Sequence, residues 1–199
     1  MSGHSDSIGI AEACAVLREE RHGAVTILTM SAVAYWGQPR EDEYRLVGLM
    51  GAAGAIGLGV AIGLPQRPVR IIDGDGSLLM QLGVLSAISD AAPPNLTYVV
   101  LENGMYSVSG GQPTPGPVDW VGLFHAAGFP DAVRCQSVEQ LRSALRGDRP
   151  GPRGIAVRCE RRRPEYPPGA FAVNPAEEAA RLRSTLTHNL SSATAIGSV

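Results

Sequence analysis

A strand pattern that runs into a Gly-Asp-Gly-Ser turn at 74–77 constrains the fold of this chain more than any other feature. Residues 69–72 are predicted to form a buried strand, and a predicted helix begins at Ser77. A strand that ends in glycines before a helix leaves backbone N–H groups and a carboxylate, here that of Asp75, at one edge of a sheet. Such an edge suits a metal ion that holds a phosphate group.

Helix and strand patterns alternate along the chain on either side of this turn. Apolar residues at helical spacing, or runs of small residues, predict helices over 8–21, 48–63, 77–91, 118–127, 138–146 and 175–186. Predicted strands cover 24–30, 69–72, 96–101, 133–136 and 155–159, and 37–43 and 110–117 are predicted loops. This alternation predicts an α/β fold class, with a mostly parallel central sheet and helices on both faces.

The length of 199 residues predicts one domain with a sizeable core. We assign 1–7 to a polar N-terminal segment, 8–186 to the domain and 187–199 to a flexible tail. The uncharged run 46–64 is long enough to cross a bilayer, but glycines recur along it and Pro65 follows at once. A tightly packed internal helix is therefore favoured over a membrane span.

The net charge and the cysteine content limit the classes of binding partner and the cellular compartment that we expect. A formal net charge of -2 and a pI near 6.1 argue against a surface for nucleic acid or anionic membrane, which usually demands a basic excess. Cys14, Cys135 and Cys159 lie far apart in sequence and indicate no disulfide framework. Because the N-terminus also lacks a signal-peptide pattern, we expect a cytoplasmic protein.

Asp75 and Asn103 each follow a predicted strand, and one crossover helix separates the two strands. In a parallel sheet both side chains then reach the carboxyl edge, where ligands bind. A carboxylate, an amide oxygen and a loop carbonyl suit Mg2+, which takes oxygen ligands and commonly keeps phosphates and waters among them. The helix that begins at Ser77 would offer N–H groups and its positive dipole end to the same phosphates.

Other known motifs with a similar sequence do not fit the segment that begins at Asp73. An EF-hand loop that begins at Asp73 needs glycine and glutamate where the chain has Leu78 and Val84. A dinucleotide fingerprint needs a third glycine where Leu79 stands, and the segment has no P-loop lysine. For the turn taken alone, an ordinary strand-to-turn Asp-Gly pair remains the alternative.

The turn and its surroundings resemble a known family. Gly-Asp-Gly at 74–76, followed after an interval by Asn103, resembles the thiamine-diphosphate signature. The blocks at 48–51, 73–80 and 110–114 resemble blocks of phosphonopyruvate decarboxylase and sulfopyruvate decarboxylase, in the right order. The resemblance implies that 8–186 is the pyrophosphate-binding domain of the thiamine-diphosphate-binding fold.

The resemblance also implies a role for each matching residue. Asp75 and Asn103 would bind Mg2+ through their side chains, and Met105 would bind it through its backbone carbonyl. The full cofactor-binding set would be Gly48, Met50, Gly74, Asp75, Gly76, Ser77, Asn103 and Met105.

Four positions would face the organic part of the cofactor or the substrate. Met50 matches the residue that props thiamine diphosphate in its bent shape, and the Gly48 carbonyl matches the acceptor of its pyrimidine amino group. Val108 and Ser109 follow the metal loop and would approach the substrate. The resemblance leaves open whether the acid carries a phosphonate, a sulfonate or an apolar tail.

The family's second domain binds the pyrimidine and supplies a glutamate, and the chain shows no match to it. Glu12, Glu19 and Glu20 lie on an amphipathic helix of surface type and are predicted to be solvated. The resemblance therefore implies a pyrimidine-binding partner subunit, in an α2β2 assembly, with no certain catalytic residue from this chain. The implied reaction converts a small 2-oxoacid to an aldehyde and carbon dioxide.

Two other functions stay open beside this decarboxylase. The chain could serve a carboligase that forms acetolactate or acyloins with the same cofactor, or it could be a non-catalytic regulatory subunit. His125 lies among apolar residues and is predicted to be packed rather than catalytic. Arg158 and the arginines at 161–163 could meet an anionic substrate or a partner, although charge runs are usually solvated.

Overall fold

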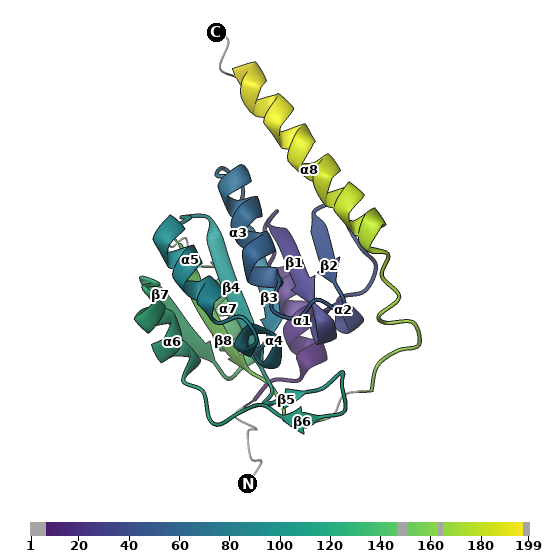
Figure 1. The fold of residues 1–199 in the computed structure, drawn as a ribbon, viewed down its shortest axis with the longest axis vertical. Coiled ribbons are helices and arrows are strands. Elements are labelled where there is room, and N and C mark those ends of the chain that lie inside the picture. Colours follow the sequence, from purple (N-terminus) through teal and green to yellow (C-terminus); the bar gives the residue numbers. More distant parts are fainter. Residues whose placement is uncertain (1–6, 147–150, 163–164, 197–199) are drawn as a thin grey trace.

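The sheet at the centre of the molecule has six strands, all parallel, in the order β2-β1-β3-β4-β8-β7 (Figure 1). The computed structural model describes residues 7–146, 151–162 and 165–196. The strands of this sheet are β1 (Val25–Thr29), β2 (Glu43–Leu46), β3 (Val69–Gly74), β4 (Leu96–Glu102), β7 (Asp131–Cys135) and β8 (Arg153–Arg158). The parallel sheet confirms the predicted α/β class.

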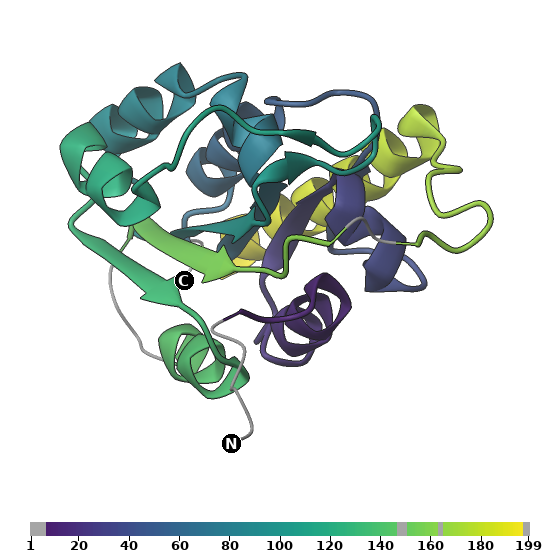
Figure 2. The same cartoon turned by 90° about the horizontal axis from the view of Figure 1, so that it is seen from below.

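Helices cover both faces of this sheet, as predicted (Figures 1 and 2). One face carries α1 (Ile10–Glu19), α2 (Met30–Trp36) and α7 (Val138–Arg146). The other carries α3 (Ala53–Gly63), α4 (Asp75–Leu79), α5 (Gly83–Ala91), α6 (Trp120–Ala127) and the start of α8 (Pro175–Ile196). Each face has its own apolar core, because successive strand side chains point to opposite sides: Ile71 enters one core and Ile72 the other.

Helix α3 lies so close to the sheet that only small residues fit on its inner face. A Cβ atom on Gly57 would overlap the side chain of Ile71, and one on Gly54 would come within 2.7 Å of Val84. The predicted small-residue helix is therefore confirmed, and close packing compensates for the poor helix propensity of its glycines.

The start of α3 differs from the predicted one at residue 48. Gly48 and Gly51 have φ angles of +79° and +83°, which lie outside the helical range, so the helix begins only at Ala53. The resulting helix has 11 residues. Within the described parts of the chain, no helix combines the length and the apolar character that a membrane span requires.

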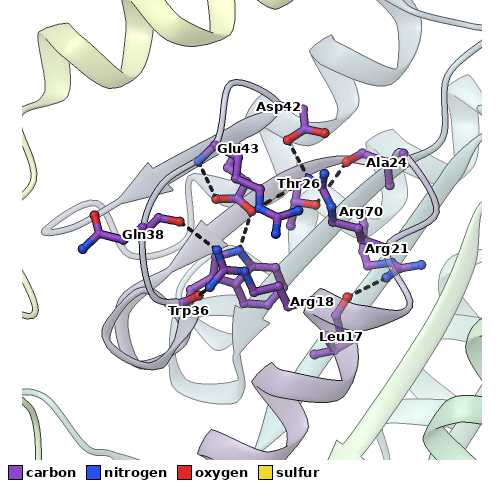
Figure 3. Close-up of polar contacts among 12 residues, drawn as sticks. Leu17, Arg18, Arg21, Ala24, Thr26, Trp36, Gln38, Asp42, Glu43 and Arg70 are labelled. Carbon is purple, nitrogen blue, oxygen red and sulfur yellow. Dashed lines mark hydrogen bonds and ion pairs between the residues drawn. The ribbon is translucent and has the colours of Figure 1, made fainter.

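The edge strand β2 was not predicted, and its first residue falls at the end of the predicted loop 37–43. Glu43 is fully buried there, accepting hydrogen bonds from Trp36 Nε1 at 2.7 Å and from the backbone N–H of Arg40 at 3.0 Å. Arg21 pairs with Asp42 at 2.6 Å beside it (Figure 3). A short strand held by charged side chains lacks the apolar alternation from which a strand is predicted.

Three other boundaries differ from prediction. The predicted helix 77–91 is two helices, α4 and α5, separated by a turn. The predicted loop 110–117 contains β6 (Gln112–Pro113), which pairs with β5 (Met105–Tyr106) as an antiparallel hairpin. Helix α8 continues to Ile196, beyond the predicted end at 186 and into the segment predicted as a tail, while 197–199 lie outside the described residues.

The prediction that Glu20 is solvated was wrong. Its side chain is buried between α1 and α7, where it pairs with Arg142 at 2.9 Å and with Arg146 at 2.7 Å. Hydrogen bonds from Arg146 and Arg142 lower the pKa of Glu20 to about 2. Glu12 and Glu19 are exposed, as predicted.

Candidate functional site

A pocket opens where the carboxyl ends of β1, β3 and β4 meet, at the edge of the sheet where ligands of α/β folds bind. Several segments far apart in sequence form its wall. The lining residues are Ile10, Thr29, Met30, Ser31, Ala32, Met50, Gly74, Asp75, Gly76, Ser77, Leu101, Asn103, Met105, Tyr106, Ser107, Val108 and Ser109. The structure thus brings nine of the ten predicted site residues into one pocket, and Gly48 is the exception.

Asp75 lies at the centre of the metal site predicted from sequence. Its carboxylate is buried and accepts hydrogen bonds from two backbone N–H groups, that of Gly76 at Oδ1 and that of Gly104 at Oδ2, both at 2.7 Å. The second bond joins the turn after β3 to the loop after β4. The predicted convergence of Asp75 and Asn103 from neighbouring strands therefore holds in the structure.

The surroundings of Asp75 make its ionised form less favourable than that of an exposed carboxyl group. Burial raises its pKa to about 6, and the nearby charge of Glu102 adds to the rise, while the backbone hydrogen bonds oppose it. None of the ion pairs between described residues includes Asp75. A buried carboxylate without a cationic partner is unfavourable, and a bound cation would relieve that cost.

Asn103 is also buried, and two hydrogen bonds define the orientation of its amide. The backbone N–H of Met105 donates to Oδ1 at 3.1 Å, and Nδ2 donates to the Ser107 hydroxyl at 2.6 Å. The atom that faces the Met105 N–H must be the acceptor oxygen, since a backbone N–H can only donate. The amide is thereby fixed without ambiguity.

These donors fit a hard divalent cation. Asp75 and Asn103 offer a carboxylate and an amide oxygen from one pocket, and Met105 lines the same pocket. Oxygen ligands of this kind suit Mg2+, which keeps phosphate and water ligands as well. No group of three His, Cys, Asp or Glu side chains with metal-binding geometry occurs among the described residues, so a site for a softer metal is not seen there.

Beneath the pocket, the buried carboxyl of Asp73 joins the ends of three strands. It accepts hydrogen bonds from Thr29 Oγ1 at 2.9 Å, from the Gly74 N–H at 2.9 Å and from Tyr98 OH at 2.8 Å. Burial raises its pKa, and hydrogen bonds, first that of Ser77, oppose the rise. Asp73 therefore ties β1, β3 and β4 together directly below the predicted diphosphate site.

The side chain of Ser77 is used within the protein. Its hydroxyl bonds to Asp73 and accepts the N–H of Gly51 at 2.9 Å, which holds the Met50 segment against the turn at 74–77. A contact between Ser77 and a diphosphate would therefore come from the backbone. Because α4 has only five residues, that contact would rest on one turn rather than on the long helix predicted.

The ring of Tyr106 packs closely against the turn at 74–77. A Cβ atom on Gly76 would lie 2.6 Å from two carbons of the Tyr106 ring, so only glycine fits at this position. The hairpin that carries Tyr106 also brings Val108 and Ser109 to the pocket, as predicted.

The sequence analysis missed several pocket residues. Thr29 is the last residue of β1 and Ser31 follows that strand, so both lie at the same sheet edge as Asp75. The rule that ligands bind beyond the carboxyl ends of parallel strands could have identified them had it been applied to β1 as well as to β3 and β4. Ser107 carried no such signal, because its contact with Asn103 depends on the hairpin.

The remaining candidates do not line this pocket. His125 is exposed on α6, so the prediction that it is packed was wrong, and its Nδ1 lies 3.1 Å from the Phe129 carbonyl. Arg158 and Arg161 line an adjoining groove that shares Asp75 and Asn103 with this pocket and also contains the Arg134–Glu102 ion pair. The third arginine of the run at 161–163, also a candidate from the sequence, lies outside the described residues.

A family comparison matches the part of the chain that builds this pocket. Residues 24–157 match the family described as "Thiamine pyrophosphate enzyme, C-terminal TPP binding domain". Thiamine pyrophosphate is another name for thiamine diphosphate. The matched range contains the turn at 74–77, the loop with Asn103 and the hairpin.

Curated relatives share a substantial part of the sequence. Phosphonopyruvate decarboxylase of Streptomyces viridochromogenes is 38% identical over 159 residues, covering 74% of this chain and 38% of that protein. Sulfopyruvate decarboxylase subunit beta of Methanocaldococcus jannaschii is 42% identical over 80 residues, covering 40% of this chain and 42% of that subunit. The match thus spans less than half the length of each of these relatives.

Solved structures share the fold. The thiamine diphosphate-dependent 4-hydroxybenzoylformate decarboxylase of Rhodococcus jostii superposes with a TM-score of 0.64 at 22% identity, over 82% of this chain and 34% of that one. Benzoylformate decarboxylase of Polynucleobacter necessarius gives the same TM-score at 20% identity.

Proposed function

Because this chain belongs to the thiamine pyrophosphate enzymes, through their C-terminal cofactor-binding domain, we propose that it is the cofactor-binding subunit of a two-chain 2-oxoacid decarboxylase. The products would be an aldehyde and carbon dioxide. The names of its relatives, phosphonopyruvate decarboxylase and sulfopyruvate decarboxylase, favour a small 2-oxoacid of that kind as substrate.

One observation carries this proposal. The buried carboxylate of Asp75 and the oriented amide of Asn103 converge in a single pocket, with no cationic side chain among the residues that line it. A bound Mg2+ would supply the missing positive charge, and the diphosphate that it holds would suit a pocket edge built from backbone N–H groups.

The role of this chain would be to bind and orient. Asp75, Asn103 and the Met105 carbonyl would hold Mg2+, and the backbone at Gly76 and Ser77 would meet the diphosphate. When bound, thiamine diphosphate supplies a carbon nucleophile and an electron sink for the loss of carbon dioxide. Met50 would support its bent shape, while apolar lining residues such as Leu101 and Val108 would limit access of water to the reacting carbon.

The proposal includes a partner subunit that binds the pyrimidine, in an α2β2 assembly in the cytoplasm. Asp75 is the only carboxyl residue among the residues that line the described pocket, so the activating glutamate would come from another chain. The name of the sulfopyruvate decarboxylase beta subunit supports a division of labour between two chains. A phosphonate or sulfonate tail would be recognised by the partner or by Arg158 and Arg161, which line the groove that adjoins Asp75 and Asn103.

Reconstitution tests this proposal. The chain is mixed with the pyrimidine-binding polypeptide that we expect to be encoded next to it, and carbon dioxide release from 2-oxoacids is measured with Mg2+ and thiamine diphosphate. We expect turnover by the mixture, none by this chain alone, and loss of turnover in Asp75→Ala. Asp90→Ala, which changes an exposed aspartate on α5, is the matched control and should behave as wild type.

Other outcomes would overturn the proposal in favour of the alternatives. Turnover by the isolated chain would remove the need for a partner. A longer hydroxyketone product formed with an added aldehyde, in place of the simple aldehyde, would indicate a carboligase. Full activity of the Asp75→Ala mixture would favour a regulatory subunit without a cofactor site.

A further inference from the structure

We propose that Ser107 is a positioning residue that fixes the amide of Asn103 with its oxygen available as a metal ligand. The inference rests on the proposed function, because it concerns how Mg2+ would be held. Ser107 is 6% exposed and Asn103 is 7% exposed, so water does not compete freely for their contact. The Nδ2···Oγ distance of 2.6 Å makes this the shortest hydrogen bond of the Asn103 side chain.

The orientation of the Asn103 side chain matters because the two ends of an amide differ chemically. An asparagine side chain presents an acceptor oxygen at one end and an NH2 donor at the other, and a rotation by half a turn exchanges them. A cation is attracted by the oxygen and repelled by the NH2 group. Ser107 engages the NH2 group as an acceptor, and the Met105 N–H engages the oxygen, so the two contacts together resist that rotation.

The hairpin places Ser107 with little freedom. Gly111 donates its N–H to the Tyr106 carbonyl at 3.0 Å, and Thr114 donates its N–H to the Gly104 carbonyl at 3.0 Å. These bonds tie both sides of the loop that carries Ser107 to the strands of the hairpin. The ring of Tyr106, next in sequence, packs against Gly76 beside the Asp75 carboxylate. One short hairpin thus couples the orientation of Asn103 to the position of the Gly-Asp-Gly turn.

Removal of the hydroxyl would leave the NH2 group of Asn103 buried and without its acceptor. A buried donor without a partner is costly, so the amide would adopt a mixture of orientations, some of which direct NH2 toward the metal. Substitution of groups that orient metal ligands typically weakens metal binding by about 10- to 100-fold. That range is the expected effect of Ser107→Ala.

The experiment measures Mg2+ affinity rather than turnover. The full chain, with its partner subunit and saturating thiamine diphosphate, is titrated with Mg2+ in a calorimeter, and thermal unfolding is followed separately without metal. We expect Ser107→Ala to raise the Mg2+ dissociation constant by about 10- to 100-fold. Without metal the variant should still unfold cooperatively, at a temperature lower by about 2–4 °C for each kcal/mol that the unpaired NH2 group costs. Ser107→Thr, which keeps the hydroxyl, should restore most of the affinity. Ser143→Ala, on the exposed side of α7, is the matched control.

A double substitution separates positioning from general damage. In an Asn103→Ala background, Ser107 has no amide to orient, so Ser107→Ala should add no further loss of Mg2+ affinity. An additional loss of the same size would overturn the inference, as would unchanged Mg2+ affinity in the single variant. If the wild-type complex binds neither Mg2+ nor thiamine diphosphate, the proposed function fails and the inference fails with it. If the wild type binds both and Ser107→Ala binds equally well, the inference alone fails.

Discussion

The pocket depends on single residues that leave no room for replacement, and Gly76 is the clearest case. Its neighbour Tyr106 closes over the turn, so that any side chain at Gly76 would push the ring or the turn away. Since Asp75 immediately precedes Gly76, displacement of the turn would also displace the carboxylate. The contact with Tyr106 therefore requires glycine at the second glycine position of the Gly-Asp-Gly motif, Gly76.

Gly76→Ala should therefore weaken binding of thiamine diphosphate with Mg2+, because the added Cβ would lie 2.6 Å from the Tyr106 ring. Tyr106→Ala in the same chain would create the missing space and should recover part of the affinity. Gly83→Ala, at a helical position with no heavy atom within 4 Å of the added Cβ, is the control and should bind as wild type. Equal binding by Gly76→Ala and wild type would contradict the steric account.

At the same scale, the sequence predicted that Asp75 and Asn103 lie close together, and both line the same pocket. Asp75 and Asn103 could be predicted because each follows a strand, and parallel strands end at one edge. Ser107 and Asp73 could not be predicted, because their roles depend on contacts across a hairpin or across three strands. A strand pattern shows that Asp73 is near the end of β3 and says nothing of its partners.

At the scale of elements, helix α3 shows how packing overrides propensity. A glycine costs roughly 1 kcal/mol in a helix relative to alanine, yet the face against the sheet keeps Gly54 and Gly57. The sequence predicted this helix from its small residues, but its start moved because Gly48 and Gly51 adopt positive φ angles. Strand β2 was missed because its sequence lacks apolar alternation, although backbone pairing with β1 places it in the sheet.

Two substitutions on α3 should have opposite effects on stability. Gly57→Ala forces a methyl group into the side chain of Ile71 and should lower the free energy of unfolding by about 1–3 kcal/mol. Gly59→Ala lies on the exposed face with no atom within 4 Å, so it should raise that free energy by up to about 1 kcal/mol. Denaturant unfolding measures both, and a stabilising Gly57→Ala would show that α3 is not closely packed.

The contact between α1 and α7 predicts a dependence of stability on acid. The arginines of α7 lower the pKa of Glu20 from the usual 4.5 to about 2. A carboxyl group with a lowered pKa in the folded state stabilises that state above its unfolded pKa, and this contribution is lost as the pH falls from about 4.5 through 2. Glu20→Gln should therefore lower the unfolding temperature at neutral pH and flatten its decline in that acid range.

Glu12→Gln provides the control for this acid dependence, because Glu12 is exposed on the same helix. It should keep the wild-type dependence of the unfolding temperature on pH. An unchanged acid profile in Glu20→Gln would mean that the ion pairs with Arg142 and Arg146 contribute nothing to folding.

At the scale of the whole molecule, the sequence predicted the sheet class and the edge of the sheet at which the pocket opens. The order of the strands, with β8 between β4 and β7, could not be predicted, because long-range pairing is not encoded in local periodicity. The resulting pocket has the side that we propose binds Mg2+, and no glutamate among its described lining residues. This asymmetry is what the proposed division of the active site between two chains would explain.

The most direct test of the central claim is a calorimetric titration of thiamine diphosphate into the complex of this chain with its partner. The account predicts saturable binding in the presence of Mg2+, loss of that binding when Mg2+ is removed by a chelator, and the same loss in Asp75→Ala. Binding that survives both the chelator and Asp75→Ala would contradict the assignment of the pocket at the ends of β3 and β4 as the metal-dependent cofactor site.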